Sequence, residues 1–309
     1  MEGTQKSRML GWSIAYILIL LSIILPLINL ITAFLLLVPV LVMYVKLGTR
    51  QFALHYVICL AVVYFATSLM FAGWVGALLV SVSLFFLPPV VQMGNLYRKR
   101  ATARSVMTAG TVTLLAELLL SLIVSNMLGL EPVNKMKQIM AESIQTLPSQ
   151  LQSMIAIDLD TLLQLTVQML PCYMIGISLI YAIVTHWLAR KILVRSGESI
   201  PSFKPIRDWM LPKSFVWLFL ISLVLWMFIH DSNSIIFTIL LNLSPLLTAA
   251  FAIQALSFLF YVAHVNRWNK TLPIIGILLL VFFWPACSIF SLLGVFDVAF
   301  PIRDRLTRK

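Results

Sequence analysis

One acidic residue, Glu117, is the side chain best placed to do chemistry in this sequence of 309 residues. It lies near the middle of an apolar run at 106–128 and is the only one of the eleven acidic residues inside a predicted hydrophobic span. A charged carboxylate at the centre of a bilayer costs about 2.5–3.5 kcal/mol or more, so we expect Glu117 to face other helices, to be paired or to be protonated. Ionisable residues in membranes usually serve function, which favours a ligand-binding or proton-relay role. The alternative is a neutral glutamic acid that hydrogen-bonds a neighbouring helix.

Four uncharged polar residues complete the candidate site. Thr113 and Ser121 lie four residues to either side of Glu117 and therefore share its helical face. Gln164 and Gln168 lie one turn apart near the outer end of the next predicted helix, where they would line the mouth of a cavity. For the two glutamines, hydrogen bonding between helices is the commoner role, so they support a site only together with Glu117.

A second polar stripe occurs later in the chain, within the apolar run at 235–263 and just beyond it. Its members follow helical spacing, and interhelical hydrogen bonding is the role we expect for them. They are Gln254, Ser257, Tyr261 and His264.

Signatures of catalysis are missing from the sequence. It contains no GxxxxGK[ST] phosphate loop, no GxSxG nucleophile motif and no HExxH zinc motif. Cys59, Cys172 and Cys287 each lie in an apolar run, without the spacing of metal ligands or redox pairs. We therefore predict a protein that is not an enzyme and that uses no cofactor or metal. A membrane-embedded enzyme acting on lipid is the weakest alternative, because one buried carboxylate without a nucleophile does not make a catalytic site.

The elements that must position these residues are membrane helices. Hydrophobic residues make up 61% of the chain and charged residues only 11%, whereas soluble domains contain about half apolar and a quarter charged residues. The sequence predicts an all-α, polytopic transmembrane helical bundle of eight or nine spans, since a crossing needs about 20 apolar residues. The predicted runs are 10–45 and 51–91, each long enough for two helices, then 106–128, 160–188, 214–229, 235–263 and 272–293.

Breaks are expected inside the two longest runs. Pro26 and Asn29 favour a turn in the first, and Gly73 and Gly76 favour one in the second. Between the fifth and sixth helices, residues 129–159 contain apolar side chains at helical spacing. They predict an amphipathic helix that lies on the membrane or caps a cavity, and lying on the membrane is the commoner outcome.

The basic residues predict the orientation of the chain. With the N-terminus in the cytoplasm, the inner segments before the C-terminal tail hold sixteen of the 22 Lys and Arg residues, and the outer loops hold only Lys135 and Lys137. This pattern accounts for the net charge of +11 without nucleic acid as a partner. Nine crossings would put the basic tail outside, against the rule, so either one run is re-entrant or the count is eight. The run at 10–45 and the last run, broken by Pro285, are the two places where this ambiguity arises.

Three regions follow from these features. A glycine and two prolines, Gly197, Pro201 and Pro205, interrupt the apolar pattern and give the best internal boundary. We expect a six-helix membrane core at 1–189, a basic cytoplasmic loop at 190–213, and a C-terminal segment at 214–309. The last contains two or three membrane helices and a basic tail.

Two stretches near the C-terminus resemble the YybS-like family of uncharacterised membrane proteins from Gram-positive bacteria. The first is the run ALSFLFYVAH at 255–264, followed by Trp268, Lys270 and Leu272-Pro273. The second is LGVFD at 293–297, followed by Arg303 and Arg305. The resemblance extends over the whole chain in helix layout and loop positions. It implies a multi-pass protein of the bacterial cell membrane.

That family is distantly similar to the substrate-binding S-components of energy-coupling-factor vitamin importers. The similarity implies six helices with both ends inside, which residues 10–189 fit, and an outer gating loop, whose place 129–159 takes. The chain departs from the S-component pattern where Ala15 is followed four residues later by Ile19 instead of a second alanine. It also has extra C-terminal crossings.

Two functions are compatible with these observations. The first is binding or transport of a small-molecule solute, with Glu117 at the site and energy from an ion gradient or from a separate energy-coupling membrane partner. The alternative is a non-transporting scaffold or accessory protein whose basic loop recruits cytoplasmic partners. In both cases the lipid bilayer is the environment of the chain.

Overall fold

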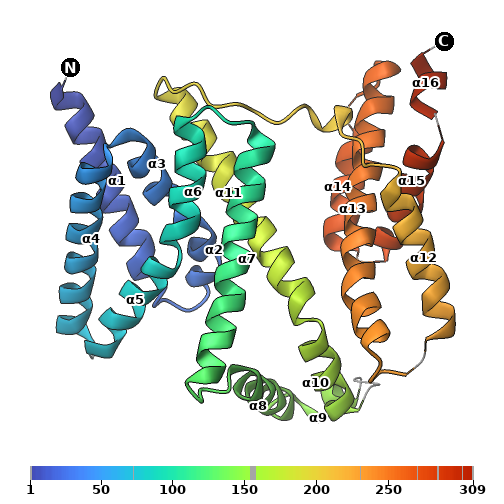
Figure 1. Cartoon of the computed structure of the whole chain (residues 1–309), viewed down its shortest axis with the longest axis horizontal. Coiled ribbons are helices and arrows are strands. Elements are labelled where there is room, and N and C mark those ends of the chain that lie inside the picture. The colour runs from blue at the N-terminus through green and yellow to red at the C-terminus, as the bar shows by residue number, and fades with distance from the viewer. Residues whose placement is uncertain are drawn as a thin grey trace. The chain divides into compact units, whose positions relative to one another are not determined.

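The computed structural model describes residues 2–71, 73–153, 158–229, 231–269, 271–283, 285–300 and 302–307, and these residues form helices and no strand. The chain divides into two compact units (Figure 1). Unit 1 comprises Met1–Pro132 and Met174–Phe203, and unit 2 comprises Val133–Tyr173 and Lys204–Lys309. Arg308 and Lys309, part of the predicted basic tail, lie outside the described residues.

Unit 1 is built from long apolar helices. They are α1 (Glu2–Ser22), α2 (Ile28–Leu35), α3 (Leu37–Lys46), α4 (Thr49–Met70), α5 (Gly73–Phe85), α6 (Leu87–Arg98), α7 (Ala103–Met127) and the larger part of α11 (Leu170–Arg195). The core of this unit contains fully buried side chains from several of them, among them Tyr16, Leu41 and Met93.

Unit 2 combines short helices with the longest helix of the described chain. Its elements are α8 (Pro132–Gln145), α9 (Ser149–Ser153), α10 (Leu159–Gln168), a 3-10 turn η1 (Ile206–Asp208), α12 (Ser214–Phe228), α13 (Ile235–Val265), α14 (Thr271–Phe282), α15 (Ala286–Ala299) and α16 (Ile302–Thr307). The α13 helix is its centre, since α12, α14, α15 and η1 all pack against it.

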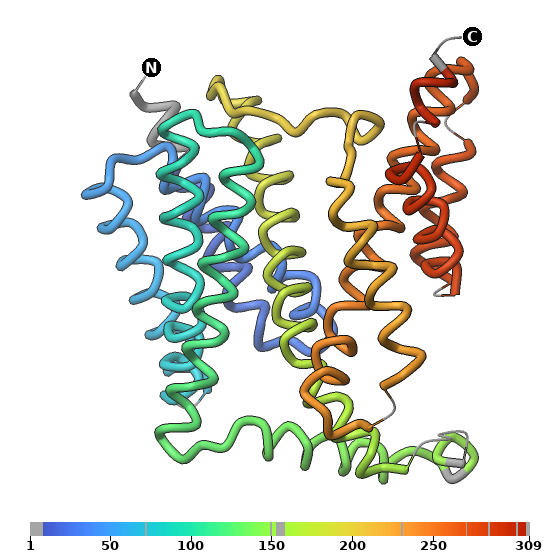
Figure 2. The backbone as a smooth tube through the Cα atoms, turned by 45° about the vertical axis from the view of Figure 1, so that its right-hand side comes forward, coloured from blue at the N-terminus to red at the C-terminus, as the bar shows by residue number. Residues whose placement is uncertain are grey.

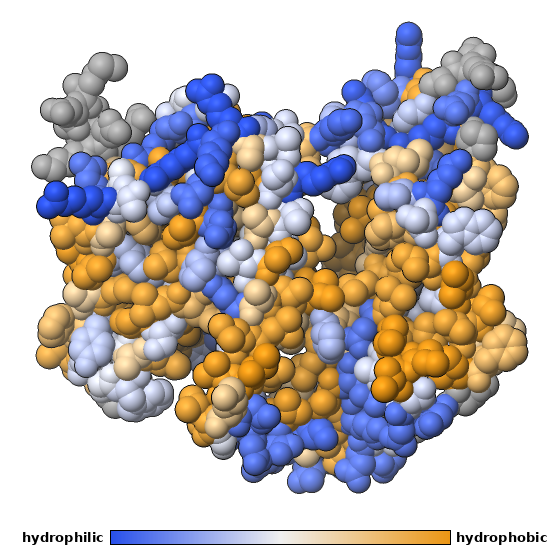
Figure 3. All heavy atoms as spheres, in the orientation of Figure 1, coloured by the Kyte–Doolittle hydropathy of each residue, from blue (hydrophilic) through white to orange (hydrophobic). Residues whose placement is uncertain are grey.

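The polytopic helical fold predicted from the sequence is confirmed. Six helical stretches are long and apolar enough to cross a membrane: Ile28–Lys46, Thr49–Met70, Gly73–Arg98, Ala103–Met127, Leu170–Arg195 and Ile235–Val265. Four shorter apolar helices accompany them, at Met9–Ser22, Ser214–Phe228, Thr271–Phe282 and Ala286–Ala299. On the face drawn in Figure 3, hydrophobic side chains cover most of the middle of each unit, and hydrophilic ones gather toward the helix ends.

Both predicted breaks in the long runs are confirmed. The α1 helix ends at Ser22 and α2 begins at Ile28, on either side of Pro26. The α4 helix ends at Met70 and α5 begins at Gly73. Proline has no N–H group and glycine has no side chain, so both weaken a helix. The positions of these residues in the sequence were therefore enough to locate the two turns.

The prediction of one continuous helix over 160–188 is wrong. The chain forms α10 up to Gln168 and α11 from Leu170, with Met169 between them. The cause is Pro171, which has no N–H group to donate and whose ring opposes the carbonyl of Val167.

The last predicted run, 272–293, in which the sequence indicated a break at Pro285, is two helices. The α14 helix ends at Phe282, and α15 begins at Ala286 directly after Pro285. Both pack on the C-terminal half of α13, and in Figures 1 and 2 this hairpin, in red, reaches only part of the way along α13. Gly294 permits the contact, because a Cβ atom there would overlap the backbone carbonyl of Phe251 on α13. The run therefore enters and returns at the same end of unit 2.

The predicted amphipathic helix in the long loop corresponds to α8, which contains no buried residue. In Figure 2 it runs crosswise to α13 of the same unit. Most apolar side chains of α8 are half-buried, and Ile139 is exposed. The place of this helix in the membrane interface stays a prediction.

Candidate functional site

Glu117 continues the buried stripe of α7 and lies near the middle of that helix. The buried residues of this helix include Ala103, Met107, Gly110 and Leu114, and Glu117 is the next position in that series of three- and four-residue steps. It stands 14 residues after the start of α7 and ten before its end, which places it about 15–21 Å from either terminus. Glu117 therefore lies on the face of α7 whose side chains, in the preceding turns, pack against other helices.

One oxygen of the Glu117 carboxyl group is buried and has no hydrogen-bond partner within the described chain. Most buried polar atoms in proteins are hydrogen-bonded, and leaving one unpaired costs free energy. A buried, unpaired acceptor or donor of this kind is a place where a proton, a solute or another polar group would be stabilised.

The two predicted companions on α7 differ in their surroundings. Thr113 is half-buried, whereas Ser121 is exposed, and the Ser121 hydroxyl donates to the carbonyl of Leu118 in its own helix at 2.8 Å. The polar face of α7 is therefore most enclosed on the Thr113 side of Glu117.

Gln164 and Gln168 belong to unit 2, on α10. The Gln164 amide donates to Asn233 Oδ1 at 3.0 Å, and the Gln168 amide donates to the Ser232 carbonyl at 2.9 Å. Both bonds attach α10 to the connection between α12 and α13, whereas the sequence favoured bonds to another helix; a role of these glutamines at the mouth of a cavity stays a prediction. The five predicted site residues fall into two groups, one in each unit.

Asn242 is a polar residue of α13 that was not among the predicted site residues. Its carbonyl oxygen accepts from the Cys172 N–H at 2.8 Å, and its amide donates to the Gln168 carbonyl at 2.7 Å. These are backbone groups on either side of the break that Pro171 creates. The sequence signal that could have revealed this contact is an amide side chain within an apolar run. The run that contains Pro171, whose Cys172 it contacts, lies 70 residues earlier.

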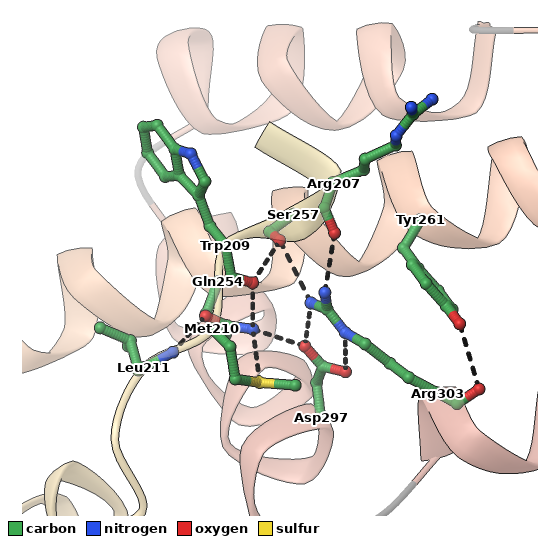
Figure 4. Close-up of polar contacts among 9 residues, drawn as sticks. All are labelled: Arg207, Trp209, Met210, Leu211, Gln254, Ser257, Tyr261, Asp297 and Arg303. Carbon is green, nitrogen blue, oxygen red and sulfur yellow. Dashed lines mark hydrogen bonds and ion pairs between the residues drawn. The ribbon is translucent and has the colours of Figure 1, made fainter. Parts of the chain in front are cut away.

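A second buried carboxylate, Asp297, was also missed. The predicted span ended at Leu293, but α15 continues to Ala299, and Asp297 on it is 1% exposed. Its charge is balanced by Arg303 of α16 (Figure 4). The Nε group of Arg303 donates to Asp297 Oδ1 at 2.9 Å, and its Nη2 group donates to Oδ2 at 2.6 Å. This two-point pairing is the strongest geometry for an arginine and a carboxylate.

The predicted stripe on α13 supplies the surroundings of that pair. The Gln254 amide donates to Asp297 Oδ2 at 2.6 Å, and the Ser257 hydroxyl accepts from Arg303 Nη2 at 3.1 Å. The Tyr261 hydroxyl donates to the Arg303 carbonyl at 3.2 Å, and the guanidinium lies 5.0 Å from the centre of the Tyr261 ring. The interhelical bonding expected of these three residues is confirmed.

The same network holds the backbone segment that precedes α12. Arg303 Nη1 donates to the Arg207 carbonyl at 2.8 Å, Ser257 donates to the Trp209 carbonyl at 2.8 Å, and the Leu211 N–H donates to Gln254 Oε1 at 3.0 Å (Figure 4). Three stretches that lie apart in the sequence, 207–211, 254–261 and 297–303, therefore meet at one ion pair.

Asp297 is fully buried, whereas Glu117 is half-buried, and the two carboxyl groups differ in how far their oxygens are hydrogen-bonded. Both Asp297 oxygens accept hydrogen bonds from charged or amide donors, so that group is occupied in holding α13, α15 and α16 together. Glu117 keeps a buried oxygen without such a bond. No group of three or more His, Cys, Asp or Glu residues that could hold a metal occurs in the parts of the chain that the structure describes.

Comparison with known proteins agrees with the helical architecture. Residues 13–298 match the model of a family described as "Predicted membrane protein (DUF2232)". A stretch of 136 residues is 28% identical to the "Uncharacterized protein YybS" of Bacillus subtilis (strain 168), and it covers 44% of this chain and 44% of that protein. No solved structure matches the chain. The chain therefore belongs to the DUF2232 family of predicted membrane proteins, and the resemblance to YybS-like proteins is confirmed.

Proposed function

We propose that this protein binds a small solute among the helices of unit 1, for transport across the cell membrane, and that Glu117 contacts the solute or carries a proton. The observation that carries the proposal is the buried, unpaired carboxyl oxygen of Glu117 on the inward stripe of a membrane helix. A buried acid that serves only as an interhelical hydrogen bond would be expected to have its partner in place, as Asp297 has.

The energy for transport would come from outside the chain. The sequence has no phosphate-binding loop, so the solute would move with an ion gradient or through an energy-coupling membrane partner. The similarity to S-components supports the second source, and the missing alanine spacing at Ala15 and Ile19 supports a different mode of docking to such a partner. The role is non-enzymatic and needs no cofactor, metal or nucleic acid.

The orientation proposed for the chain is N-terminus in the cytoplasm of a bacterial cell. The α14–α15 hairpin supports this orientation, because it enters and returns at one end. With α1 and the 15-residue α12 counted as crossings beside the six long stretches, the chain then has eight crossings. The tail with Arg303 and Arg305 then lies on the same side as the basic loops, and only Lys135 and Lys137 lie outside. The conflict that nine crossings would create disappears.

The experiment compares Glu117→Gln and Glu117→Leu with the wild-type protein in reconstituted vesicles. The vesicles are incubated with a metabolite extract, and the retained small molecules are identified by mass spectrometry. The matched control is Glu142→Gln on α8, where the carboxylate accepts a bond from Gln138 at an exposed position. We expect the retained solute to fall at least tenfold for both Glu117 variants and to be unchanged for the control.

A scaffold role is the alternative function, and it is tested by comparing Glu117→Gln with variants of the basic loop. Parts of the basic loop are bonded to unit 1, since Lys46 pairs with Glu198 at 2.9 Å and Arg190 donates to the Ile200 carbonyl at 3.3 Å. If neutral substitutions at Arg190, Lys191 and Arg195 abolish function in cells while Glu117→Gln does not, the transport proposal is wrong and the scaffold role is favoured.

A further inference from the structure

A cavity of about 870 Å³ opens in unit 2 beside the C-terminal end of α13. One wall is the last two turns of that helix with the turn that follows it, and the other is the start of η1 at Pro205, Ile206 and Arg207. The Asp297–Arg303 network fixes both walls, because Arg303 holds the Arg207 carbonyl and the Tyr261 hydroxyl. The cavity is therefore a defined part of the fold.

The polar lining of this cavity is basic. Arg207, His264 and Arg267 belong to the lining, and among the residues that the structure describes no acidic one does. The Arg207 guanidinium lies 3.7 Å from the Asp208 carboxylate, and both side chains are at least 40% exposed, so this pairing is weak in water. In Figure 4 the Arg207 side chain points away from the Arg303 network, which uses only its backbone carbonyl.

The apolar lining is rich in aromatic rings. Phe260 and Tyr261 come from α13, and Trp268 comes from the turn that ends it. Trp268 is 57% exposed, and tryptophan at the end of a membrane helix is typical of the level of the lipid headgroups. Aromatic and basic groups side by side suit a ligand that has both a charged and an apolar part.

Arg267 occupies a backbone conformation that arginine rarely adopts. Its φ is 53°, in the left-handed region. The Trp268 N–H donates to the Ala263 carbonyl and the Arg267 N–H to the His264 carbonyl, which is the hydrogen-bond pattern of a Schellman cap. Glycine is the usual residue at this position because it has no Cβ atom. Arg267 therefore adds a positive charge to the residues that line the cavity, while its left-handed backbone conformation destabilises the end of α13.

Three other helices in the described chain end with the same pair of bonds, so the end of α13 can be compared with helix ends of the same protein. Gly129 and Gly197 occupy the left-handed position after α7 and α11, with φ values of 71° and 90°. Arg100 occupies it after α6, with a φ of 52°. Arg100 belongs to unit 1 and does not line the cavity. It is therefore a matched control for the backbone effect of Arg267.

We propose that this cavity binds the phosphate-bearing headgroup of an anionic phospholipid. Arg207 and Arg267 would hold the phosphate oxygens, and Phe260 and Trp268 would pack against the glycerol and upper acyl carbons. The carbonyls at the end of α13 carry partial negative charge, but the cap bonds use two of them and the two guanidinium groups outweigh the remainder. Basic pockets between membrane helices on the cytoplasmic side are known sites for such headgroups. This site is separate from Glu117 and does not depend on the proposed transport function.

The test titrates the full-length protein in detergent with phosphatidylglycerol, phosphatidylcholine or inorganic phosphate, and measures bound lipid by native mass spectrometry and the melting temperature Tm. For the wild-type protein we expect phosphatidylglycerol alone to bind and to raise Tm. Arg267→Gly removes the cation and relieves the left-handed strain, so it should melt no lower than wild type without lipid, yet bind phosphatidylglycerol at least tenfold more weakly. Arg100→Gly should keep wild-type lipid binding.

Several outcomes would overturn the proposal. Wild-type lipid binding by Arg267→Gly would do so, as would an equal loss in Arg100→Gly, which would indicate non-specific surface charge. If inorganic phosphate raises Tm as much as phosphatidylglycerol does, the site takes a free anion and the lipid assignment is wrong. Arg207→Gln gives an independent measurement, because it leaves the backbone carbonyl that Arg303 uses, and it too must weaken phosphatidylglycerol binding.

Discussion

Removing the charge of Asp297 should destabilise the protein more than removing any exposed carboxylate. The side chain of Asp297 is 0% exposed, and that of its partner Arg303 is 12% exposed. The substitution Asp297→Asn keeps the size of the side chain but removes the carboxylate charge that the buried Arg303 guanidinium faces. Three N–H bonds are affected, two from Arg303 and one from Gln254.

The expected magnitude follows from the geometry of the pair. Breaking a buried ion pair by removing one partner costs about 3–5 kcal/mol, because an unpaired charge stays out of water. The two-point bonding between Asp297 and Arg303 places this pair toward the upper part of that range. The Lys46–Glu198 pair provides the matched control, because its N–O distance is 2.9 Å but Glu198 is 42% exposed. For Glu198→Gln we therefore expect a loss of about 1 kcal/mol or less.

The assay is reversible unfolding of the full-length protein in mixed micelles, with the free energy of unfolding obtained for each variant. A double variant, Asp297→Leu with Arg303→Met, removes both charges and should be more stable than Asp297→Asn alone. If Asp297→Asn loses no more stability than Glu198→Gln, or if the double variant is less stable than Asp297→Asn, the ion pair does not hold these helices together.

Three further predictions use the same unfolding assay. Asn242→Leu should cost about 1–3 kcal/mol, because it leaves backbone groups on both sides of the α10–α11 break unpaired; an unchanged free energy of unfolding would mean that water replaces the amide. Gly294→Ala should cost about 1–3 kcal/mol, because the added methyl group overlaps the Phe251 carbonyl and forces α15 away from α13; a neutral result would contradict the close contact. Arg100→Gly should stabilise the protein by about 1 kcal/mol, since glycine adopts the left-handed conformation after α6 without strain; a loss would show that the Arg100 side chain makes stabilising contacts.

The helical membrane fold could be predicted from the sequence because its signals are local. Apolar runs of sufficient length determine the spans, and Pro26 and Gly73 interrupt them at the places where α1 and α4 are followed by turns. Glu117 was likewise recognisable, because a single acidic residue in an apolar run must face inward, and it continues the buried stripe of α7.

The features that were missed depend on partners far away in the sequence. Asp297 looked like a residue beyond the last span, and its burial follows from Arg303 and from Gln254, which is 43 residues away. The break between α10 and α11 needs Asn242 to satisfy its backbone, and this residue lies 70 positions after Cys172. Pro285 signalled the break in the last run, whereas the break at Pro171 was missed because the run is apolar on both sides of it.

The most direct test of the central proposal is native mass spectrometry of the wild-type protein and of Glu117→Gln, each purified gently from the same host membranes. We predict that the wild-type protein carries a small non-lipid molecule that Glu117→Gln lacks, while both keep the same lipids. The Arg267→Gly variant should keep the small molecule and lose anionic lipid, so the two sites can be told apart. If wild type and Glu117→Gln carry identical molecules, or if both carry lipids alone, Glu117 is not part of a solute site and the proposed function is wrong.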